Sequence, residues 1–429
     1  MTFDALGLSA PLLRALDELG YGAPTPVQVA TIPAILQGRD LWASAQTGSG
    51  KTAAFVLPIL ERLFVSSSLA RARTARFDSR PPSRGAVLVL ILVPTRELAV
   101  QTGQAIARYG RHLPVPLEPC VAVGGVSIDR QLQALASGAQ LLVATPGRLL
   151  DLVDKNALSL ATLQTLVLDE ADRLLSVGFA DQLAALLAQL PADSQRLLFS
   201  ATFPPKVVAL AELLLRDPIR INLDAGATPS ASVIQQRVIE VDAGQRSALL
   251  QHLLAQHAWP QLLVFVASKL AADELALTLS RAGFRAWPLH GELGQDARTQ
   301  TLTDFKAGRF QVLVATDLAP RGLDIVQLPA VLNFDLPRSA ADYTHRIGRT
   351  GRAGETGVAL SFVSASNAAH FRLIERRHHI QLEREQIGGF EPKELAVPVR
   401  DEHGGIKGKR KSKKDKLREA LARSEPTRR

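Results

Sequence analysis

Eight residues near the N-terminus, Ala45-Gln46-Thr47-Gly48-Ser49-Gly50-Lys51-Thr52, constrain this chain more than any other stretch. Residues 39–44 before them end in an apolar run that predicts a short buried strand, and residues 53–57 after them predict a helix. A glycine-rich turn between strand and helix gathers backbone N–H groups into one concavity, and the helix N-terminus adds partial positive charge. The pattern predicts a phosphate-binding loop, although its first position is Ala45 rather than the usual glycine.

Lys51 and Thr52 carry the side chains that such a loop needs. The lysine would reach the β- and γ-phosphates of a nucleotide, and the threonine hydroxyl would be a Mg²⁺ ligand. The competing interpretation is a chance glycine and serine turn. The intact Gly-Lys-Thr sequence between a predicted strand and a predicted helix disfavours it.

Length and composition set the frame for this loop. A chain of 429 residues with 46% hydrophobic residues predicts two or three domains with full cores. The single cysteine, Cys120, excludes an internal disulfide and a cysteine metal cluster, as expected in a reducing compartment. There is no run of 18 or more apolar residues and no pattern of a signal peptide at the N-terminus. We therefore expect a cytoplasmic protein without a membrane partner.

The net charge of +9 is concentrated at the C-terminus. Residues 401–429 hold 11 Lys and Arg against 5 Asp and Glu, so the first 400 residues are nearly balanced. We expect residues 391–429 to form a basic disordered tail that binds RNA through its phosphates, without sequence preference. A tail that only improves solubility is the alternative.

A second arginine-rich stretch, residues 66–84, has no apolar period. It predicts an exposed loop. A solvated insertion is favoured there over an RNA contact.

The N-terminal segment predicts two helices. Thr25 suits the N-cap of the second helix and Pro26 suits its first turn. Gln28 has two interpretations that the pattern leaves open. It is either a solvated helix residue, or an amide that reads both the donor and the acceptor of an adenine edge while Phe3 stacks on the base.

Three further apolar runs predict buried parallel strands, at residues 86–93, 121–123 and 141–144. Each is followed by small, hydroxyl or arginine residues, at the sheet edge where open α/β folds bind their ligands. Small residues let a sugar-phosphate backbone approach, and threonine or arginine can hold its phosphates without reading bases. Ordinary turn chemistry is the alternative for any one of these edges. Three in succession favour a nucleic-acid contact.

Residues 166–168 predict another strand, which ends at Asp169-Glu170-Ala171-Asp172. A carboxylate at a strand end facing the phosphate loop suits Mg²⁺, and a neighbouring glutamate can orient and deprotonate the attacking water. Ser200-Ala201-Thr202 ends the strand after that.

With these motifs in place, the chain resembles the DEAD-box RNA helicases from about Phe3 to Phe390, and most closely their bacterial RhlE-type branch. The resemblance implies an α/β fold of two tandem RecA-like domains with parallel sheets, ATP in the cleft between them, and single-stranded RNA across both. It assigns adenine reading to Phe3, Thr25 and Gln28, phosphate and Mg²⁺ binding to Lys51 and Thr52, and metal and water to Asp169 and Glu170. Ser200 and Thr202 would couple hydrolysis to strand separation. RNA contacts would come from Pro94, Thr95, Arg96, Gly125, Thr145 and Arg148.

The second half repeats the alternation of strands and helices. We expect a first domain over residues 1–222 with its adenine-reading element at 1–29, a linker at 223–232 whose composition is small and polar, and a second domain over 233–390. In this domain the family match places RNA contacts at Gln295, Thr316 and Gly322, and a contact with the ATP ribose at Asp324. Arg298 also stands at the family's position. Pro320 departs from the pattern and removes one backbone donor from its loop.

Residues 345–352, His-Arg-Ile-Gly-Arg-Thr-Gly-Arg, complete the motif set. Arginines in this spacing would be a solvated basic face in most proteins. Opposite a phosphate loop they are better interpreted as groups that stabilise charge on the γ-phosphate. By family match Arg349 and Arg352 take that role, and His345 links to Asp172 and Ser200.

The sequence thus predicts an ATP-dependent RNA helicase that uses ATP and Mg²⁺, unwinds short duplexes locally, and remodels RNA or RNA–protein complexes. Ribosomal precursor particles and the RNA-decay machinery are compatible partners. Two other classes stay open: an ATP-regulated RNA clamp or chaperone with weak unwinding, which the Pro320 loop supports, and a DNA translocase on the same fold.

Overall fold

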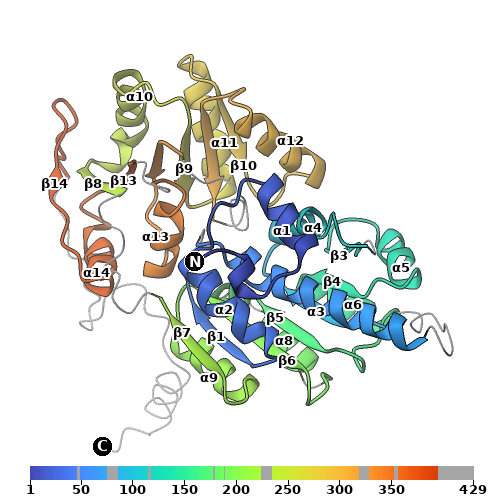
Figure 1. Cartoon of the computed structure of the whole chain (residues 1–429). Coiled ribbons are helices and arrows are strands. Elements are labelled where there is room, and N and C mark those ends of the chain that lie inside the picture. The colour runs from blue at the N-terminus through green and yellow to red at the C-terminus, as the bar shows by residue number, and fades with distance from the viewer. Residues whose placement is uncertain are drawn as a thin grey trace, which may run out of the picture.

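The computed structural model describes residues 1–45, 49–74, 86–114, 117–176, 179–187, 189–223, 234–317, 328–351 and 356–394. Side chains are described for these residues except at 66–74, 176, 180, 181 and 295. Figure 1 shows two lobes, one from each half of the chain, each built on its own sheet with helices on both faces. The prediction of two tandem α/β domains with parallel sheets is confirmed.

The first sheet has seven strands in the order β3-β4-β2-β5-β6-β1-β7, and all its neighbours pair in parallel. Because both faces are covered, its strands are short apolar runs, as the sequence predicted. The strands are β1 Leu41–Ser44, β2 Val89–Leu92, β3 Cys120–Ala122, β4 Leu141–Ala144, β5 Thr165–Leu168, β6 Gln195–Ser200 and β7 Ile219–Asn222.

Two apolar cores sandwich this sheet. One core packs the N-terminal helices against one face, and the other packs the later helices against the opposite face. The first group is η1 Asp4–Leu6, α1 Ala10–Glu18, α2 Pro26–Leu36, α3 Lys51–Thr74 and α4 Arg96–Tyr109. The second group is α5 Ile128–Ala136, α6 Pro146–Asp154, α7 Ala171–Ser176, α8 Ala180–Leu187 and α9 Pro205–Leu214.

The second sheet is also parallel and has seven strands, in the order β10-β11-β9-β12-β13-β8-β14. Helices α10 and α11 cover one face, and α12, α13 and α14 cover the other. The strands are β8 Ile234–Glu240, β9 Leu262–Val266, β10 Ala286–Leu289, β11 Val312–Thr316, β12 Ala330–Asn333, β13 Gly357–Val363 and β14 Arg384–Glu385. The helices are η2 Ala243–Gln245, α10 Arg246–Gln256, α11 Lys269–Arg281, α12 Gln295–Lys306, α13 Ala340–Ile347 and α14 Ala368–His378.

The structure corrects the sequence-based prediction at one segment and adds contacts beyond the predicted end of the second domain. Helix α3 continues to Thr74, so residues 66–74 of the expected loop are helical. The Leu, Ala and Arg residues there are strong helix formers, and no glycine or proline interrupts them. At the other end of the chain, Asp242 accepts backbone hydrogen bonds from Lys393 and Glu394 at 2.8 and 3.1 Å. The rest of the expected loop, residues 224–233 and residues 395–429 lie outside the described residues.

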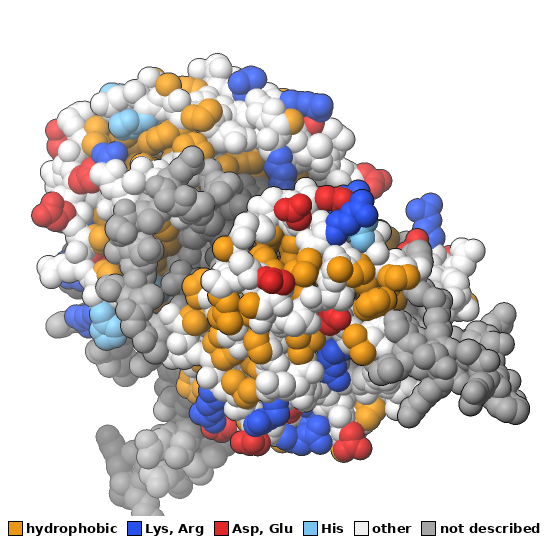
Figure 2. All heavy atoms as spheres, in the orientation of Figure 1, with side chains coloured by type: hydrophobic (Ala, Val, Ile, Leu, Met, Phe, Trp, Pro, Cys, Tyr) orange, Lys and Arg blue, Asp and Glu red, His pale blue; other side chains and the backbone are white. Residues whose placement is uncertain are grey.

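No helix in the described ranges is long and apolar enough to cross a membrane. On the face shown in Figure 2, basic and acidic side chains are interspersed over both lobes. This mixture agrees with the nearly balanced charge of the first 400 residues.

Candidate nucleotide and RNA site

The phosphate loop leaves β1 at its carboxyl end and leads into α3. Ala45 and Lys51 are buried, and the Lys51 Nζ donates a hydrogen bond to the Ala45 carbonyl oxygen at 2.8 Å. Gly50 adopts a φ of +95°, a conformation that glycine tolerates best. Ser49, Gly50 and Thr52 are half-buried, whereas Gln46, Thr47 and Gly48 lie outside the described residues.

The N-terminus of α2 packs directly on this loop. The Gln28 Oε1 accepts from the backbone N–H of Thr25 at 2.9 Å, and its Nε2 donates to the Gly50 carbonyl at 3.2 Å. A Cβ added to Gly50 would lie 2.5 Å from the Gln28 Nε2 and 3.0 Å from the Thr25 Oγ1. The structure therefore places Gln28 against the phosphate loop, at 1% exposure, and not on the solvated helix face of the alternative interpretation.

Phe3 begins a series of three aromatic rings that contact one another. Its ring is buried and meets Tyr21 edge to face at a centroid distance of 6.4 Å, and Tyr21 meets Tyr109 in the same way at 5.9 Å. The two tyrosine hydroxyl groups hydrogen bond at 2.8 Å. Tyr109 ends α4, so this series of aromatic rings connects the N-terminal segment with a helix that begins beside Thr95.

Asp169 follows β5, close to the phosphate loop. It is 3% exposed, and its Oδ1 accepts from the backbone N–H of Glu170 at 2.9 Å. Burial raises the pKa of this carboxyl group from 3.8 to about 6, although the nearby Lys51 ammonium opposes the rise.

The donors at Asp169 and Thr52 fit Mg²⁺, a hard cation that binds oxygen and usually takes only one or two carboxylates from the protein. Among the described residues no group of three or more His, Cys, Asp or Glu side chains could hold a metal ion. A Mg²⁺ site here would therefore need oxygens from a bound nucleotide and water as well.

Glu170 has an unusual backbone, with a φ of +51° at a residue that is not glycine. Its carboxylate is buried and lies 3.4 Å from the Arg173 Nε, whose side chain is also buried. Sequence reasoning gave Arg173 no role. The residue directly follows the Asp169–Asp172 motif, but nothing in the pattern indicates which neighbour it would meet.

Three of the four residues predicted to couple hydrolysis to strand separation form one hydrogen-bonded unit. The Thr202 Oγ1 donates to Asp172 Oδ2 at 2.6 Å, the Asp172 backbone N–H donates to Ser200 Oγ at 3.2 Å, and Ser200 Oγ donates to the Thr202 carbonyl at 2.7 Å. His345, on α13 of the second domain, is buried and lines a small cavity together with Arg173. The structure thus brings His345 near Arg173, the residue after Asp172, across the domain boundary.

A groove of about 690 Å³ runs between the two domains. Five of the six residues predicted to contact RNA in the first domain line it, and residues of the second domain complete it. The lining includes Pro94, Thr95, Arg96, Glu97, Gly124, Thr145, Gly147, Arg148, Asp151, Arg173, Gln182, Gly291 and Arg298.

Gly125, the sixth of these residues, contacts Arg96, which lines the groove. Its φ is +79°, and a Cβ there would lie 2.1 Å from the Arg96 Nη1, so the Arg96 guanidinium rests on this glycine. Arg148 is held as well. Its Nη1 donates to Gln131 Oε1 at 2.9 Å and its Nη2 to the Val126 carbonyl at 3.1 Å. Both arginines therefore face the groove from fixed positions.

The contact that closes the groove is an ion pair between the domains. The Arg298 Nη2, on α12, lies 2.8 Å from the Glu97 Oε1, on α4, and the two side chains are 9% and 8% exposed. Sequence reasoning assigned neither residue a role, because no local pattern shows that two positions so far apart in the chain will meet. The family's placement of Arg298 and the position of Glu97 after Pro94-Thr95-Arg96 were the available signals.

The other predicted residues of the second domain are only partly described. Thr316 is half-buried at the end of β11, and Gln295 begins α12. Arg349 is buried and lines the same small cavity as His345 and Arg173. Pro320, Gly322, Asp324 and Arg352 lie outside the described residues, as does the side chain of Gln295.

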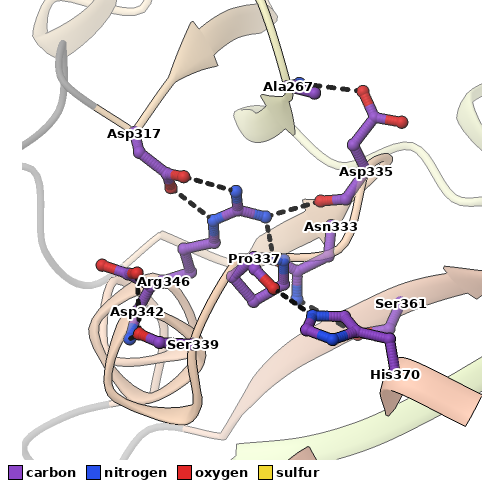
Figure 3. A network of polar contacts seen from close by, with 10 residues as sticks. All are labelled: Ala267, Asp317, Asn333, Asp335, Pro337, Ser339, Asp342, Arg346, Ser361 and His370. Atoms are coloured by element: carbon purple, nitrogen blue, oxygen red, sulfur yellow. Dashed lines mark hydrogen bonds and ion pairs between the residues drawn. The ribbon is translucent and has the colours of Figure 1, made fainter. Parts of the chain in front are cut away.

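Arg346, which the sequence analysis left without a role, is the centre of a network of polar contacts in the second domain (Figure 3). Its guanidinium donates to both carboxylate oxygens of Asp317, at 2.6 and 2.9 Å. It also donates to Asn333 Oδ1 at 2.9 Å and to the Asp335 carbonyl at 2.6 Å. Since Asp317 directly precedes residues 318–327, Arg346 joins α13 to the base of the segment that holds Gly322 and Asp324.

Comparison with known proteins bears on this arrangement. The family model for DEAD/DEAH box helicases matches residues 25–210, and the model for the helicase conserved C-terminal domain matches residues 245–354. The DEAD-box ATP-dependent RNA helicase CshA of Geobacillus kaustophilus is 40% identical over 383 residues, which cover 89% of this chain and 78% of that protein. The ATP-dependent rRNA helicase RRP3 of Gibberella zeae is 40% identical over 375 residues, covering 87% and 73%.

A solved structure of S. cerevisiae Dbp5 bound to RNA and ADP BeF3 superposes with a TM-score of 0.75 at 30% identity. The match covers 90% of this chain and 95% of that one. The similarity therefore extends over both domains.

Proposed function

This chain belongs to the DEAD-box family of ATP-dependent RNA helicases, and we propose that it separates short RNA duplexes locally and so remodels RNA or RNA–protein complexes. The observation that carries the proposal is the groove built from both domains and closed by the buried pair Glu97 and Arg298. A ligand that contacts both walls stabilises the closed arrangement over the open one. Single-stranded RNA in this groove would thereby link RNA binding to closure.

The catalytic assignment follows from the geometry of the first domain. Lys51 would bind the β- and γ-phosphates, Thr52 and Asp169 would hold Mg²⁺, and Glu170 would orient the attacking water and accept its proton. The ion, when bound, neutralises charge on the phosphate oxygens. In support, Lys51 lies close enough to Asp169 to oppose the rise in the pKa of its carboxyl group.

Adenine selection is assigned to Phe3, Thr25 and Gln28. The Gln28 amide already contacts the Gly50 carbonyl and the Thr25 backbone, and each of its polar atoms has capacity for one more hydrogen bond. Base recognition and phosphate binding would share one rigid element. In the phosphate loop, Ala45 to Thr52 would surround the phosphates, including Gln46, Thr47 and Gly48.

Completion of the site is assigned to the second domain. Arg349 and Arg352 would stabilise the charge that develops on the γ-phosphate, Asp324 would contact the ribose, and His345 would pair with the unit of Asp172, Ser200 and Thr202. The buried positions of Arg349 and His345 in a cavity shared with Arg173 support this proposal. Hydrolysis would then require closed domains.

RNA is held through its backbone in this proposal. Arg96 and Arg148 would neutralise phosphates, Thr95, Thr145 and Thr316 would donate hydroxyl hydrogen bonds, and small residues would allow close approach. Since these groups read no base edges, we expect little sequence preference. Pro94, Gly125, Gln295 and Gly322 are assigned to the same surface.

We place the chain in the RhlE-type branch on general sequence similarity and in the cytoplasm on its single cysteine. Ribosomal precursor particles are the partner that we favour over the RNA-decay machinery, in view of the similarity to an rRNA helicase. Copurification with precursor ribosomal particles, compared between the parent and a Lys51→Ala variant, tests that choice.

The first test of the function is steady-state ATP hydrolysis with and without single-stranded RNA, beside DNA of the same sequence. Stimulation by RNA alone, together with ATP-dependent separation of a short RNA duplex, is the expected result. Stimulation without strand separation would favour an ATP-regulated clamp, and equal stimulation by DNA would favour a translocase. The Lys51→Ala variant is the control for contaminating ATPase.

A further inference from the structure

Arg173 occupies a place that none of the assigned roles explains. It lines the groove between the domains, and it also lines the small cavity that holds His345 and Arg349. Among the described residues it is the one that borders both spaces. It therefore stands between the surface assigned to RNA and the part of the second domain assigned to ATP hydrolysis.

The side chain is tied to Glu170 at short range. The Arg173 Nε lies 3.4 Å from the Glu170 Oε2, and the two side chains are 6% and 8% exposed. The turn that carries both side chains is itself hydrogen bonded, because the Arg173 N–H donates to the Glu170 carbonyl at 2.9 Å and to Asp172 Oδ1 at 3.1 Å.

The position of the Glu170 carboxylate thus depends on Arg173. A buried carboxylate needs a partner, and within the described residues the Glu170 Oε2 has no hydrogen-bond donor besides this ion-pair contact. A guanidinium has five N–H donors in a rigid plane, so it can hold one carboxylate and face a second anion at the same time. On the groove side, a phosphate of bound RNA would supply such an anion, beside the Asp151 and Asp154 carboxylates that also line the groove.

We propose that Arg173 is a positioning residue that makes ATP hydrolysis depend on RNA, by fixing the Glu170 carboxylate when an RNA phosphate enters the groove. This inference rests on the proposed function. An RNA phosphate beside the guanidinium restricts its rotation, and through the ion pair it restricts the carboxylate that must meet the attacking water. Orientation of a catalytic base is a recognised source of rate, since small displacements are costly.

The test compares Arg173→Ala, Arg173→Lys and the parent in steady-state ATP hydrolysis, with and without single-stranded RNA. We expect Arg173→Ala to lower the RNA-stimulated kcat about tenfold, and to lower the ratio of stimulated to basal kcat at least about fivefold, with the KM for ATP changed less than about twofold. Arg173→Lys keeps the charge and should recover part of the ratio. Thermal unfolding of each variant shows whether it is folded.

Arg196→Ala is the matched control. Arg196 is a partly buried arginine of the same domain whose guanidinium bonds to the Leu214 and Pro191 carbonyls, away from both spaces. Its loss should lower stability and leave the stimulation ratio at the parent value. An equal fall of stimulated and basal kcat in Arg173→Ala would make Arg173 merely structural and overturn the inference.

A second measurement tests whether Arg173 acts through Glu170. In a Glu170→Gln background, adding Arg173→Ala should lower the residual RNA-stimulated rate of hydrolysis less than about twofold, because the carboxylate on which Arg173 acts is already lost. A further tenfold fall in that background would show that Arg173 acts independently of Glu170 and would overturn the inference. If the parent itself shows no stimulation by RNA, the proposed function fails; if the parent is stimulated and Arg173→Ala keeps its ratio, only this inference fails.

Discussion

The two adjacent carboxylates after β5 lie in different surroundings, and these predict different properties. Asp169 is hydrogen bonded to a backbone N–H and lies near Lys51, whereas the Glu170 Oε2 lies 3.4 Å from the Arg173 guanidinium. Both are buried, and burial is the main cause that raises the pKa of the Asp169 carboxyl group. Substitution by the matching amide tests each one without removing its bulk.

For Glu170→Gln we expect kcat for ATP hydrolysis to fall at least about 100-fold, because the amide cannot accept a proton from water. ATP affinity should stay within about twofold, since the phosphate loop is untouched. Single-turnover hydrolysis and titration with a fluorescent ATP analogue measure the two quantities. Turnover at the parent rate would remove Glu170 from its assigned role.

Asp169→Asn gives a prediction on stability with a definite sign. The folded chain raises the pKa of the Asp169 carboxyl group from 3.8 to about 6, so it binds that proton more tightly than the unfolded chain does. The free energy of unfolding therefore falls as the pH rises from about 4 to about 6, and the loss stays constant above this range. Without nucleotide or Mg²⁺, the amide variant should be more stable than the parent at pH 7.5 by about 1–3 kcal/mol.

Urea denaturation of both proteins between pH 5 and pH 8 measures this difference. The advantage of the Asp169→Asn variant should shrink toward the acid end of the series. The same gain at every pH would show that the amide packs better, and that ionisation of Asp169 carries no cost.

At the scale of elements, the loops after the strands have to present side chains from fixed positions. Gly125 shows how this is done, because its left-handed backbone and missing Cβ leave room for the Arg96 guanidinium. Gly138 has a similar φ of +94°, but a Cβ added there would meet nothing within 4 Å. A comparison of alanine variants at these two glycines therefore separates the effect of backbone strain from the effect of displacing Arg96.

We expect Gly125→Ala and Gly138→Ala each to cost about 1–2 kcal/mol of stability from the left-handed backbone. Gly125→Ala alone must also move Arg96, and should weaken RNA binding about tenfold, the equivalent of one lost phosphate contact at about 1.4 kcal/mol. Fluorescence anisotropy with a labelled single strand measures the affinity. Equal RNA affinity in both variants would mean that the position of Arg96 does not matter for binding.

The network around Arg346 predicts a difference between buried and exposed ion pairs (Figure 3). The Arg346 side chain is 3% exposed, so Asp317→Asn would leave a buried guanidinium without its counter-charge and should cost about 3 kcal/mol. Asp304→Asn breaks a pair whose arginine, Arg309, is 64% exposed, and should cost less than about 1 kcal/mol. Thermal unfolding of both variants measures the contrast, and similar losses would show that Arg346 is not held by its charge.

The sequence predicted elements well and contacts between elements poorly, for one physical reason. Buried parallel strands are continuous apolar runs, and caps such as Thr25 and Pro26 are local, so both are visible in a short window. The contacts of Arg173, Arg298 and Arg346 depend on which residues the fold brings together. Helix α3 ran beyond its expected end because helix propensity over residues 66–74 outweighed the polar composition that suggested a loop.

At the scale of the whole molecule, the buried pair Glu97 and Arg298 joins the two domains within the described part of the chain. Both side chains are buried, and both line the groove between the domains. Opening of the domains would return the two charges to water. The pair therefore contributes to the difference between closed and open arrangements more than to the fold of either domain.

The last prediction follows from this asymmetry. Glu97→Gln or Arg298→Gln leaves one charge buried and unpaired in the closed arrangement only, at a cost of up to about 3 kcal/mol, which corresponds to about 100-fold weaker ATP-dependent RNA binding. Thermal stability should change little, because the open arrangement hydrates the remaining charge. The exposed pair of Arg39 and Asp217 lies within the first domain, so Asp217→Asn is the control that should leave RNA affinity unchanged.

In the double variant Glu97→Gln with Arg298→Gln no buried charge is left, and the RNA affinity should recover by about tenfold over the worse single variant. Two single losses that simply add would show that the residues act independently, and that closure does not depend on their meeting.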